Sequence, residues 1–275
     1  MEIDYPTGAQ EPQLRTLWRL AFGDSDEFIT GFFASGYCPR RCRCAAENGN
    51  VAAALYWFDA EFRGQKFAYL YAVATHPDFR NRGLCRALMA DAAACLTGRG
   101  YDGALLMPHD VGLRKMYGRM GYRDCCTVSE FSCDAGEAVA VRPISAVEFA
   151  RLRREYLPPD GVIQEGANLS YLKCCAAFYA GGDFLLAAEH DGDSLTGMEL
   201  LGNAAAAPGI LGALGFSHGH FRTPGTALPG TMFRPLRAGA DAPGYFGSRF
   251  LTFQVYFFMF FSIETGFFPY FCRIK

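Results

Sequence analysis

Two periods of hydrophobicity divide the chain into predicted helices and strands. Apolar side chains spaced three and four positions apart share one helix face, whereas short apolar or alternating runs are typical of strands. The first spacing predicts helices over residues 11–22, 25–35, 84–96 and 112–120. Runs rich in aromatic and β-branched residues predict strands over residues 43–50, 51–58, 67–75, 101–107 and 122–133. This alternation favours an α/β fold around a mixed sheet.

The pattern after residue 135 is weaker but has the same character. Ser145 followed by Glu148 has the spacing of a helix capping box, and Gly215 is suited to end a short helix over residues 208–214. Strands are expected over residues 183–189, 216–223 and 231–235. The order of strands and helices suggests a degenerate second copy of an α/β unit, which would be an α+β half following the first.

A small polar segment, 134–137, marks a boundary in the chain. We therefore expect an N-terminal domain over residues 1–135, a second half over residues 136–247 and a Phe-rich tail of unknown role over residues 248–275. Within the tail a buried β-hairpin turning at residues 264–266 is favoured. An exposed oligomer or membrane contact and a segment foreign to the rest of the protein stay open. The uninterrupted apolar run is shorter than the roughly 20 residues of a membrane-spanning helix.

Composition narrows the class of protein and its location. Hydrophobic residues make up 51% and charged residues 20% of the chain, as in globular proteins. The net charge of -2 gives no electrostatic reason to expect a nucleic-acid partner. The N-terminus lacks the basic and apolar regions of a secretory signal, and 11 cysteines, an odd number, argue against a fully paired disulfide set. We therefore expect a cytoplasmic protein that handles small molecules.

The cysteines are also candidate metal ligands. Cys38, Cys42 and Cys44 form the tightest cluster in the sequence. Structural zinc sites usually have two close pairs separated by a wider gap, and no second group with that spacing follows. No metal is expected.

The segment that carries the most chemical information is Tyr69–Gly83, YLYAVATHPDFRNRG. It runs from a hydrophobic strand through a loop into an Ala-rich helix. The first turn of a helix has free backbone N–H groups and the positive end of the helix dipole. Gly83 allows the backbone to approach an anion closely, and Arg80 and Arg82 can add charge-assisted hydrogen bonds. The loop is therefore suited to bind a diphosphate.

Two motifs in order resemble the GNAT acetyltransferase superfamily. Its acyl-CoA loop, Arg/Gln-x-x-Gly-x-Gly/Ala, is matched by residues 80–85, RNRGLC, with Cys85 at the last small position. His76-Pro77 precedes the loop, as is common in the family. The later Tyr-x-x-x-Gly-Phe pattern is matched by residues 117–122, YGRMGY, with a tyrosine in the last position. The resemblance covers roughly residues 14–124 and implies the GNAT fold, a mixed and mostly antiparallel sheet flanked by helices.

The wording of the second motif is similar to that of the tandem-GNAT acetyltransferases of the enhanced-intracellular-survival type. VRPISAVEFARLRREY, from residue 141, is similar to the helix that opens their second unit, and TMFRPL, from residue 231, to a strand near its end. That group has a further C-terminal domain and uses a C-terminal carboxylate in catalysis. The Phe-rich tail does not match it, so no catalytic role is carried over to Lys275.

The resemblance implies an acetyltransferase that uses acetyl-CoA as co-substrate, with direct attack of an amine on the thioester. It assigns cofactor binding to Val73, Ala74, Thr75, Arg80, Asn81, Arg82, Gly83, Leu84, Cys85 and Arg86. Tyr117 is expected to be the general acid, since a phenol with a pKa of about 10 can protonate a CoA thiolate. The general base stays open between His109, Glu47, Glu61, Asp110 and water.

The functional hypothesis is therefore an acyltransferase that acetylates a primary amine of a small molecule or peptide. A non-catalytic CoA-binding sensor or interaction module is the alternative, favoured by the weak second half. A membrane-associated acyltransferase anchored by the tail is a third hypothesis and is less favoured. The acceptor and the oligomeric state, including a homo-oligomer, are left open by the sequence, because acceptor specificity is set by loops.

Overall fold

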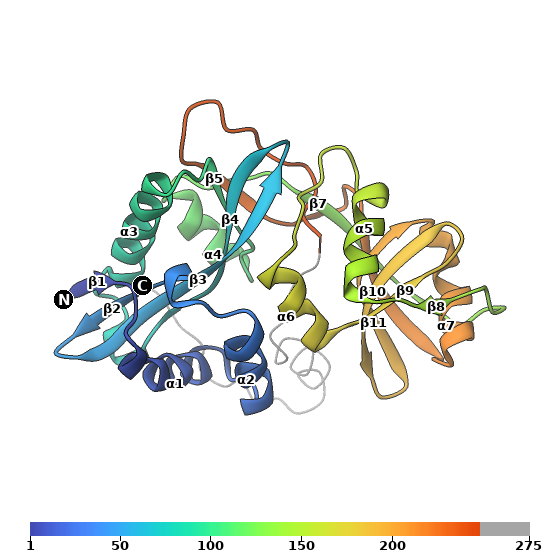
Figure 1. The fold of residues 1–275 in the computed structure, drawn as a ribbon, viewed down its shortest axis with the longest axis horizontal. Helices are drawn as coiled ribbons and strands as arrows, with labels where there is room; N and C mark the ends of the chain where they lie inside the picture. The colour runs from blue at the N-terminus through green and yellow to red at the C-terminus, as the bar shows by residue number, and fades with distance from the viewer. Residues whose placement is uncertain (248–275) are drawn as a thin grey trace.

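The computed structural model describes residues 1–247 and contains two seven-stranded sheets that lie side by side (Figure 1). The first sheet has the strand order β1-β2-β3-β4-β5-β14-β6. Its strands are β1 (Glu2–Asp4), β2 (Cys42–Glu47), β3 (Asn50–Phe62), β4 (Gln65–Thr75), β5 (Gly103–Leu106), β14 (Met232–Pro235) and β6 (Arg123–Asp124). The pair β4–β5 is parallel and the other pairs are antiparallel. This is the mixed, mostly antiparallel sheet predicted from the sequence.

The second sheet has the order β13-β7-β12-β11-β10-β9-β8. Its strands are β13 (Leu228–Pro229), β7 (Thr127–Asp134), β12 (His218–Pro224), β11 (Ser194–Gly202), β10 (Phe184–Asp191), β9 (Ala177–Ala180) and β8 (Arg142–Pro143). Here β11–β12 is the parallel pair. In reverse, this order is β8-β9-β10-β11-β12-β7-β13, which matches the first sheet strand for strand, with β8 equivalent to β1, β11 to β4 and β7 to β14. The predicted degenerate second copy is therefore confirmed.

The two sheets exchange one strand each. β14, from the end of the described chain, lies between β5 and β6 in the first sheet. β7, from the first half of the sequence, lies between β12 and β13 in the second. The two exchanged strands occupy equivalent positions, and each sheet is therefore complete only when both halves of the sequence are present. We call the two units, each one sheet with its helices, the first and second lobes.

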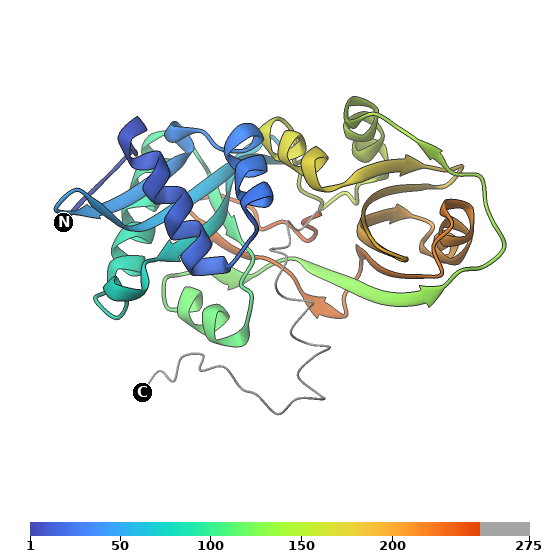
Figure 2. The same ribbon diagram turned by 90° about the horizontal axis from the view of Figure 1, so that it is seen from below.

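Helices cover both faces of each sheet. In the first lobe, α1 (Glu11–Phe22) and α2 (Asp26–Ser35) pack on one face, and α3 (Leu84–Gly98) and α4 (Val111–Gly118) on the other. In the second lobe, α5 (Ala146–Tyr156) and α6 (Ala167–Cys175) lie on the side of the first lobe, and the sheet curves around α7 (Ala207–Leu214; Figure 2). One hydrophobic core runs from α1 and α2 through α6 into the second lobe, so the lobes share a buried interface.

Local signals explain where the predicted helices begin. Ser25 accepts a hydrogen bond from the backbone N–H of Phe28 and starts α2, and Ser145 accepts one from the backbone N–H of Glu148 and starts α5.

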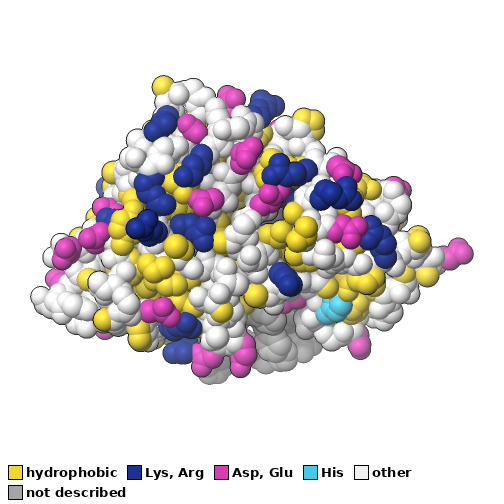
Figure 3. All heavy atoms as spheres, viewed as in Figure 1, with side chains coloured by type: hydrophobic (Ala, Val, Ile, Leu, Met, Phe, Trp, Pro, Cys, Tyr) yellow, Lys and Arg dark blue, Asp and Glu magenta, His cyan; other side chains and the backbone are white. Residues whose placement is uncertain are grey.

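Charged side chains of both signs are mixed on the surface. On the face seen in Figure 3, Lys and Arg side chains lie among Asp and Glu side chains. None of the helices within residues 1–247 is both long enough and apolar enough to cross a membrane.

The prediction of one strand over residues 122–133 is wrong. Residues 123–124 pair with β14 in the first sheet, whereas β7 begins at Thr127 in the second. The break occurs because the backbone of Cys125 and Cys126 bonds to the returning segment at Thr231 and Gly230, where the chain crosses between the lobes. The elements α6, β9 and β11 were not predicted from the sequence. The predicted hairpin in the tail lies outside the described residues, and the division at residue 135 stays a prediction.

A buried ion pair joins α5 to the second sheet. Arg153 donates from Nε and Nη2 to the carboxylate of Glu199 on β11, at 2.8 and 2.9 Å, and the Tyr245 hydroxyl donates to the same carboxylate at 3.0 Å. Arg153 also donates to the carbonyl of Val162. Glu199 is fully buried, so its charge depends on these partners.

Replacing Arg153 by methionine is expected to lower the free energy of unfolding by about 3 kcal/mol, because Glu199 would keep a buried charge without its guanidinium partner. Urea unfolding measures the change. Arg151→Met is the matched control, since it removes an exposed ion pair with Glu155 from the same helix and should cost less than about 1 kcal/mol. Similar losses in the two variants would contradict the role assigned to the buried pair.

Candidate acyl-CoA site

The first sheet opens between β4 and β5. The two strands pair from Phe67 opposite Gly103 to Leu70 opposite Leu106. Beyond that point β4 continues along β3 to Thr75, whereas β5 ends at Leu106. Within residues 1–247, the last five residues of β4 therefore have no partner on the β5 side. Their backbone groups on that edge are available to a bound molecule.

A bulge lies in this open part of β4. Ala54 is opposite Ala74 and Tyr56 is opposite Tyr71, so two residues of β4, Ala72 and Val73, face one residue of β3. Ala72 has a φ of 48°, a conformation that costs a residue with a Cβ about 1 kcal/mol or more. Such strain is concentrated at functional sites, because the bulge re-aims neighbouring backbone groups.

The loop after β4 leads directly into α3. Pro77–Phe79 forms a single 3-10 turn, and Arg80 Nε donates to the carbonyl of Thr75 at 3.3 Å, which holds the loop against the end of β4. Asn81 has a φ of 62° and Gly83 a φ of 76°, so two left-handed residues turn the chain into the helix. The loop therefore places the predicted residues 80–83 between the open strand and the start of α3.

The first turn of α3 is open to a ligand. Gly83 is its N-cap and has no side chain to cap it, and the first helical hydrogen bond runs from Ala87 N–H to the Gly83 carbonyl. The N–H groups of Leu84, Cys85 and Arg86 therefore have no acceptor within the helix. A Cβ added at Gly83 would meet no atom within 4 Å, so the space in front of this turn is open. These features suit an anion.

Exposed arginines surround this turn. Arg80, Arg82 and Arg86 are exposed. Arg82 lies over the ring of Phe79 at 5.0 Å and 3.5 Å from the carboxylate of Glu47. An anion at the start of α3 would compete with Glu47 for this guanidinium, and the exposed pair is weak enough to be exchanged.

Tyr117, on α4, is buried beside the start of α3. Its ring meets that of Tyr122 edge-on at 6.0 Å, and both pack in one core cluster with Leu84 and Cys85. Burial raises the pKa of Tyr117 above its usual value, and the thiol of Cys85 raises it further. Among residues 1–247 the Tyr117 hydroxyl makes no hydrogen bond, so its proton is available to a bound molecule.

The structure brings the predicted cofactor residues together. Val73, Ala74 and Thr75 lie on the open edge of β4, residues 80–83 form the adjoining loop, and residues 84–86 form the first turn of α3. Leu84 contributes only backbone there, because its side chain is 7% exposed and packs in the core.

None of the four candidate side chains for the general base has a position in the described residues that identifies it as the base. Asp110 accepts a hydrogen bond from Leu113 N–H at 2.7 Å and caps α4, and Glu47 is paired with Arg82. His109 and Glu61 are exposed. No geometry within the described residues assigns any of them to the reaction.

Sequence reasoning missed a buried carboxylate. Asp24, in the turn between α1 and α2, is 3% exposed and accepts a hydrogen bond from Trp18 Nε1 at 2.7 Å. Its charge raises the pKa of Tyr71 and of Tyr171, so it lies close to both phenols. Tyr71 is the residue directly before the bulge of β4. In the sequence Asp24 is indistinguishable from an ordinary turn residue, since only the tertiary fold buries it.

The second lobe does not repeat the diphosphate loop. β11 also parts from its parallel neighbour β12 after Gly197, but residues 203–206, which lead into α7, are Asn and three Ala. Pro208 removes one N–H from the first turn. A Cβ at Gly209 would lie 2.9 Å from the carbonyl oxygen of Glu137, which shows that residues 137–139 cover this helix end. Within residues 1–247, no group of three or more His, Cys, Asp or Glu side chains could hold a metal ion.

Comparison with known proteins agrees with this geometry. Residues 2–125 match the family model described as the acetyltransferase (GNAT) domain. No curated protein matches the chain. Solved structures match both lobes. A GCN5-related N-acetyltransferase from Anabaena variabilis superposes with a TM-score of 0.68 at 13% identity, over 86% of this chain and 73% of its own.

Two further structures show the same two-lobed fold. Eis1 from Mycobacterium abscessus has a TM-score of 0.63 at 14% identity, over 86% of this chain and 74% of its own. A putative acetyltransferase from Pyrococcus horikoshii has a TM-score of 0.63 at 11% identity, over 91% of this chain and 95% of its own. At these identities the likeness is one of fold, and it extends to the second lobe.

Replacing Tyr117 by phenylalanine is expected to make the free energy of unfolding fall less steeply as the pH rises above 10. Tyrosine ionises near pH 10 in the unfolded chain, whereas the buried phenol, with its raised pKa, stays protonated when folded. Above that pH the unfolded state binds fewer protons than the folded state. The phenol therefore lowers the free energy of unfolding by about 1.4 kcal/mol per pH unit above its unfolded pKa.

Urea unfolding between pH 8 and 11 tests this. The free energy of unfolding of wild type minus that of Tyr117→Phe should be constant at the lower end and decrease above pH 10. Curves that stay parallel over the whole range would show that this phenol is not buried.

Proposed function

We propose that the protein is an acetyl-CoA-dependent N-acetyltransferase that acts on a primary amine of a small molecule or peptide, because residues 2–125 match the model of the acetyltransferase (GNAT) domain. The observation that carries the proposal is the open first turn of α3 beside the bulged, unpaired end of β4. An anion-binding helix end and a free strand edge are what a diphosphate joined to an extended pantetheine chain requires.

The diphosphate would be held by the N–H groups of residues 84–86 and by the exposed arginines of the loop. Gly83 leaves the space for it. The free edge of β4, Val73–Thr75, would bind the pantetheine and polarise the thioester carbonyl through its N–H groups, which stabilises the charge that develops on the oxygen. Acetyl-CoA supplies the electrophilic carbonyl carbon.

The transfer needs one bond made, one broken and two proton movements. The neutral amine forms a C–N bond with the carbonyl carbon, and the C–S bond then breaks. Tyr117 would donate its proton to the departing thiolate, and the amine proton would leave through water or a base. Its raised pKa keeps the phenol protonated at neutral pH, so the acid is present in the required form.

Gly83→Glu is expected to weaken acetyl-CoA binding by tenfold or more, because it places a carboxylate where the diphosphate would bind. Gly83→Gln is the matched control. It has the same size and the same backbone strain at a φ of 76°, but no charge. Calorimetric titration of both variants with acetyl-CoA separates charge from strain, and equal affinities in the two variants would refute a diphosphate at this turn.

Tyr117→Phe is expected to lower kcat about a hundredfold while leaving the affinity for acetyl-CoA unchanged, because only proton donation is removed. Steady-state kinetics with an amine that the wild type acetylates, together with a calorimetric titration, measure both quantities. Unchanged kcat would exclude Tyr117 as the acid. Binding of acetyl-CoA with no turnover of any amine by the wild type would instead favour a non-catalytic CoA-binding module.

A further inference from the structure

Two adjacent cysteines lie where the chain crosses from the first lobe to the second. Cys125 and Cys126 follow β6 and precede β7, and both are free thiols. Their sulfur atoms are 3.4 Å apart, which is a contact distance and longer than the roughly 2.05 Å of a disulfide bond. Cys125 is partly exposed, whereas Cys126 is 1% exposed. The pair therefore combines one thiol that a reagent can reach with a second thiol directly beside it.

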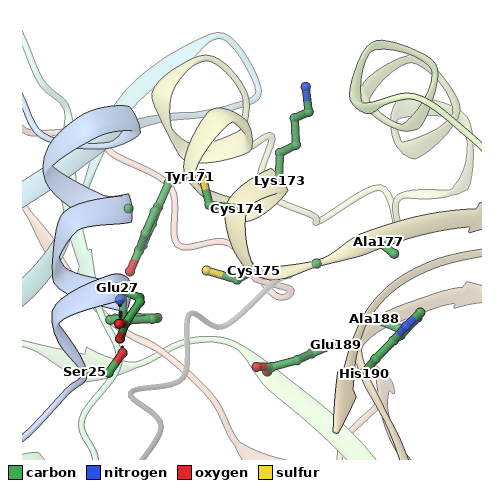
Figure 4. A pocket seen from close by; sticks show the side chains of 13 residues that line it. Ser25, Glu27, Tyr171, Lys173, Cys174, Cys175, Ala177, Ala188, Glu189 and His190 are labelled. Atoms are coloured by element: carbon green, nitrogen blue, oxygen red, sulfur yellow. Dashed lines mark hydrogen bonds between the residues drawn. The ribbon is translucent and has the colours of Figure 1, made fainter. Parts of the chain in front are cut away.

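A second adjacent pair, Cys174 and Cys175, is arranged differently. Both residues lie in the last turn of α6 and line a cavity, and Figure 4 shows their sulfur atoms pointing in different directions. Neighbouring side chains leave a helix about 100° apart, which explains the separation. The Cys174 thiol instead donates to the hydroxyl of Ser35 at 3.4 Å. Adjacency in the sequence alone therefore does not bring two thiols together, and this second pair is a control for the first.

The surroundings of the first pair favour ionisation of Cys125. Hydrogen bonds from the Cys126 thiol and from the hydroxyl of Thr231 lower the pKa of Cys125, because both stabilise the thiolate. The bond to Cys125 is also the main cause that raises the pKa of Cys126, so this effect ends once Cys125 is joined to another sulfur. Since the thiolate is the nucleophile in thiol–disulfide exchange, Cys125 is suited to attack first and Cys126 to react second.

Two backbone hydrogen bonds hold the pair against the segment that returns from the second lobe. Cys125 N–H donates to the carbonyl of Thr231 at 3.2 Å, and the carbonyl of Cys126 accepts from Gly230 N–H at 2.8 Å. Adjacent Cα atoms are about 3.8 Å apart, less than the roughly 4.4–6.8 Å that a disulfide usually spans. Joining the two sulfur atoms would therefore rotate the peptide between them and disturb both hydrogen bonds.

The returning segment also contacts the helix α4. Arg114 donates to the carbonyl of Gly230 at 3.1 Å and forms an ion pair with Asp124, the residue before the cysteine pair. Tyr117 lies about one turn further along the same helix. A rotation at the cysteine pair would therefore displace the start of α4 and, with it, the phenol proposed as the general acid.

We propose that Cys125 and Cys126 form a thiol–disulfide exchange site that reacts with a low-molecular-weight disulfide and reversibly inactivates the enzyme. The thiolate of Cys125 attacks one sulfur of the reagent, whose S–S bond breaks and releases the first thiolate. Cys126 then loses its proton and displaces the second thiolate from Cys125. Both departing thiolates take up a proton, so the reagent gains two electrons and the protein gains one disulfide. The inactivation rests on the proposed acetyltransferase function, whereas formation of the disulfide does not.

Mass spectrometry after oxidation tests the site without requiring turnover. Folded full-length protein is incubated with oxidised glutathione, and the remaining thiols are alkylated before digestion. The peptide with the pair should lack two hydrogen atoms and carry no alkyl group on either cysteine. Cys126→Ser should instead accumulate glutathione joined to Cys125, because no second thiol displaces it, and Cys125→Ser should react at neither position. Cys174 and Cys175 should form no disulfide with each other in the same sample.

Kinetics test the connection to α4. The oxidised wild type should acetylate an amine with a kcat at least tenfold lower, and dithiothreitol should restore it, because a strained disulfide is easily reduced. Cys125→Ser is expected to keep its kcat through the same treatment. Cys174→Ser, the matched control, should lose activity as the wild type does. Chromatography of the acetylated product avoids reagents that react with protein thiols.

Reduced Cys125 and Cys126 in folded wild type after the incubation would overturn the exchange site, and this result needs no variant. Equal formation of a disulfide between Cys174 and Cys175 would overturn it as well. An unchanged kcat in fully oxidised protein would refute the coupling to α4. If the reduced wild type acetylates no amine, the proposed function fails, and the mass spectra still decide whether the pair is an exchange site.

Discussion

The exchange of β7 and β14 is the constraint on which the rest of the molecule depends. Each strand is held on both sides by strands of the opposite half, so the lobes cannot separate without breaking hydrogen bonds inside both sheets. A hydrophobic core shared through α6 adds to this connection. The strand pairing and the shared core therefore hold the two lobes in one relative position.

The same architecture is used differently in the two lobes. In the first, β4 and β5 stop pairing after Leu70, and the adjoining start of α3 has no capping side chain and lies among exposed arginines. In the second, Glu199 on the equivalent strand β11 forms a buried ion pair with Arg153 of α5, and residues 137–139 cover the helix end. The first lobe therefore has an open helix start of the kind that suits an anion, whereas the equivalent helix start of the second lobe is covered.

Short-range signals made much of this predictable from sequence. Ser25 and Ser145 mark helix starts, and the loop around Gly83 is recognisable because its left-handed turn, its arginines and the following helix are contiguous. The misses depend on distant partners. β11 carries Glu199, a charge that a buried strand usually excludes, and its partner Arg153 is 46 residues away. No local pattern reveals that residues 123–124 and β7 belong to different sheets, or that Asp24 is buried.

The strand exchange also constrains how the protein can fold during its synthesis on the ribosome. β14 begins at Met232, so a nascent chain shorter than this has every motif of the acyl-CoA loop but an unfilled gap between β5 and β6. Until the ribosome has released those residues, the edge of β5 presents unpaired backbone groups to other chains, which is the geometry that promotes aggregation. The first lobe matures only after almost all of the second has been synthesised, although its sequence comes first.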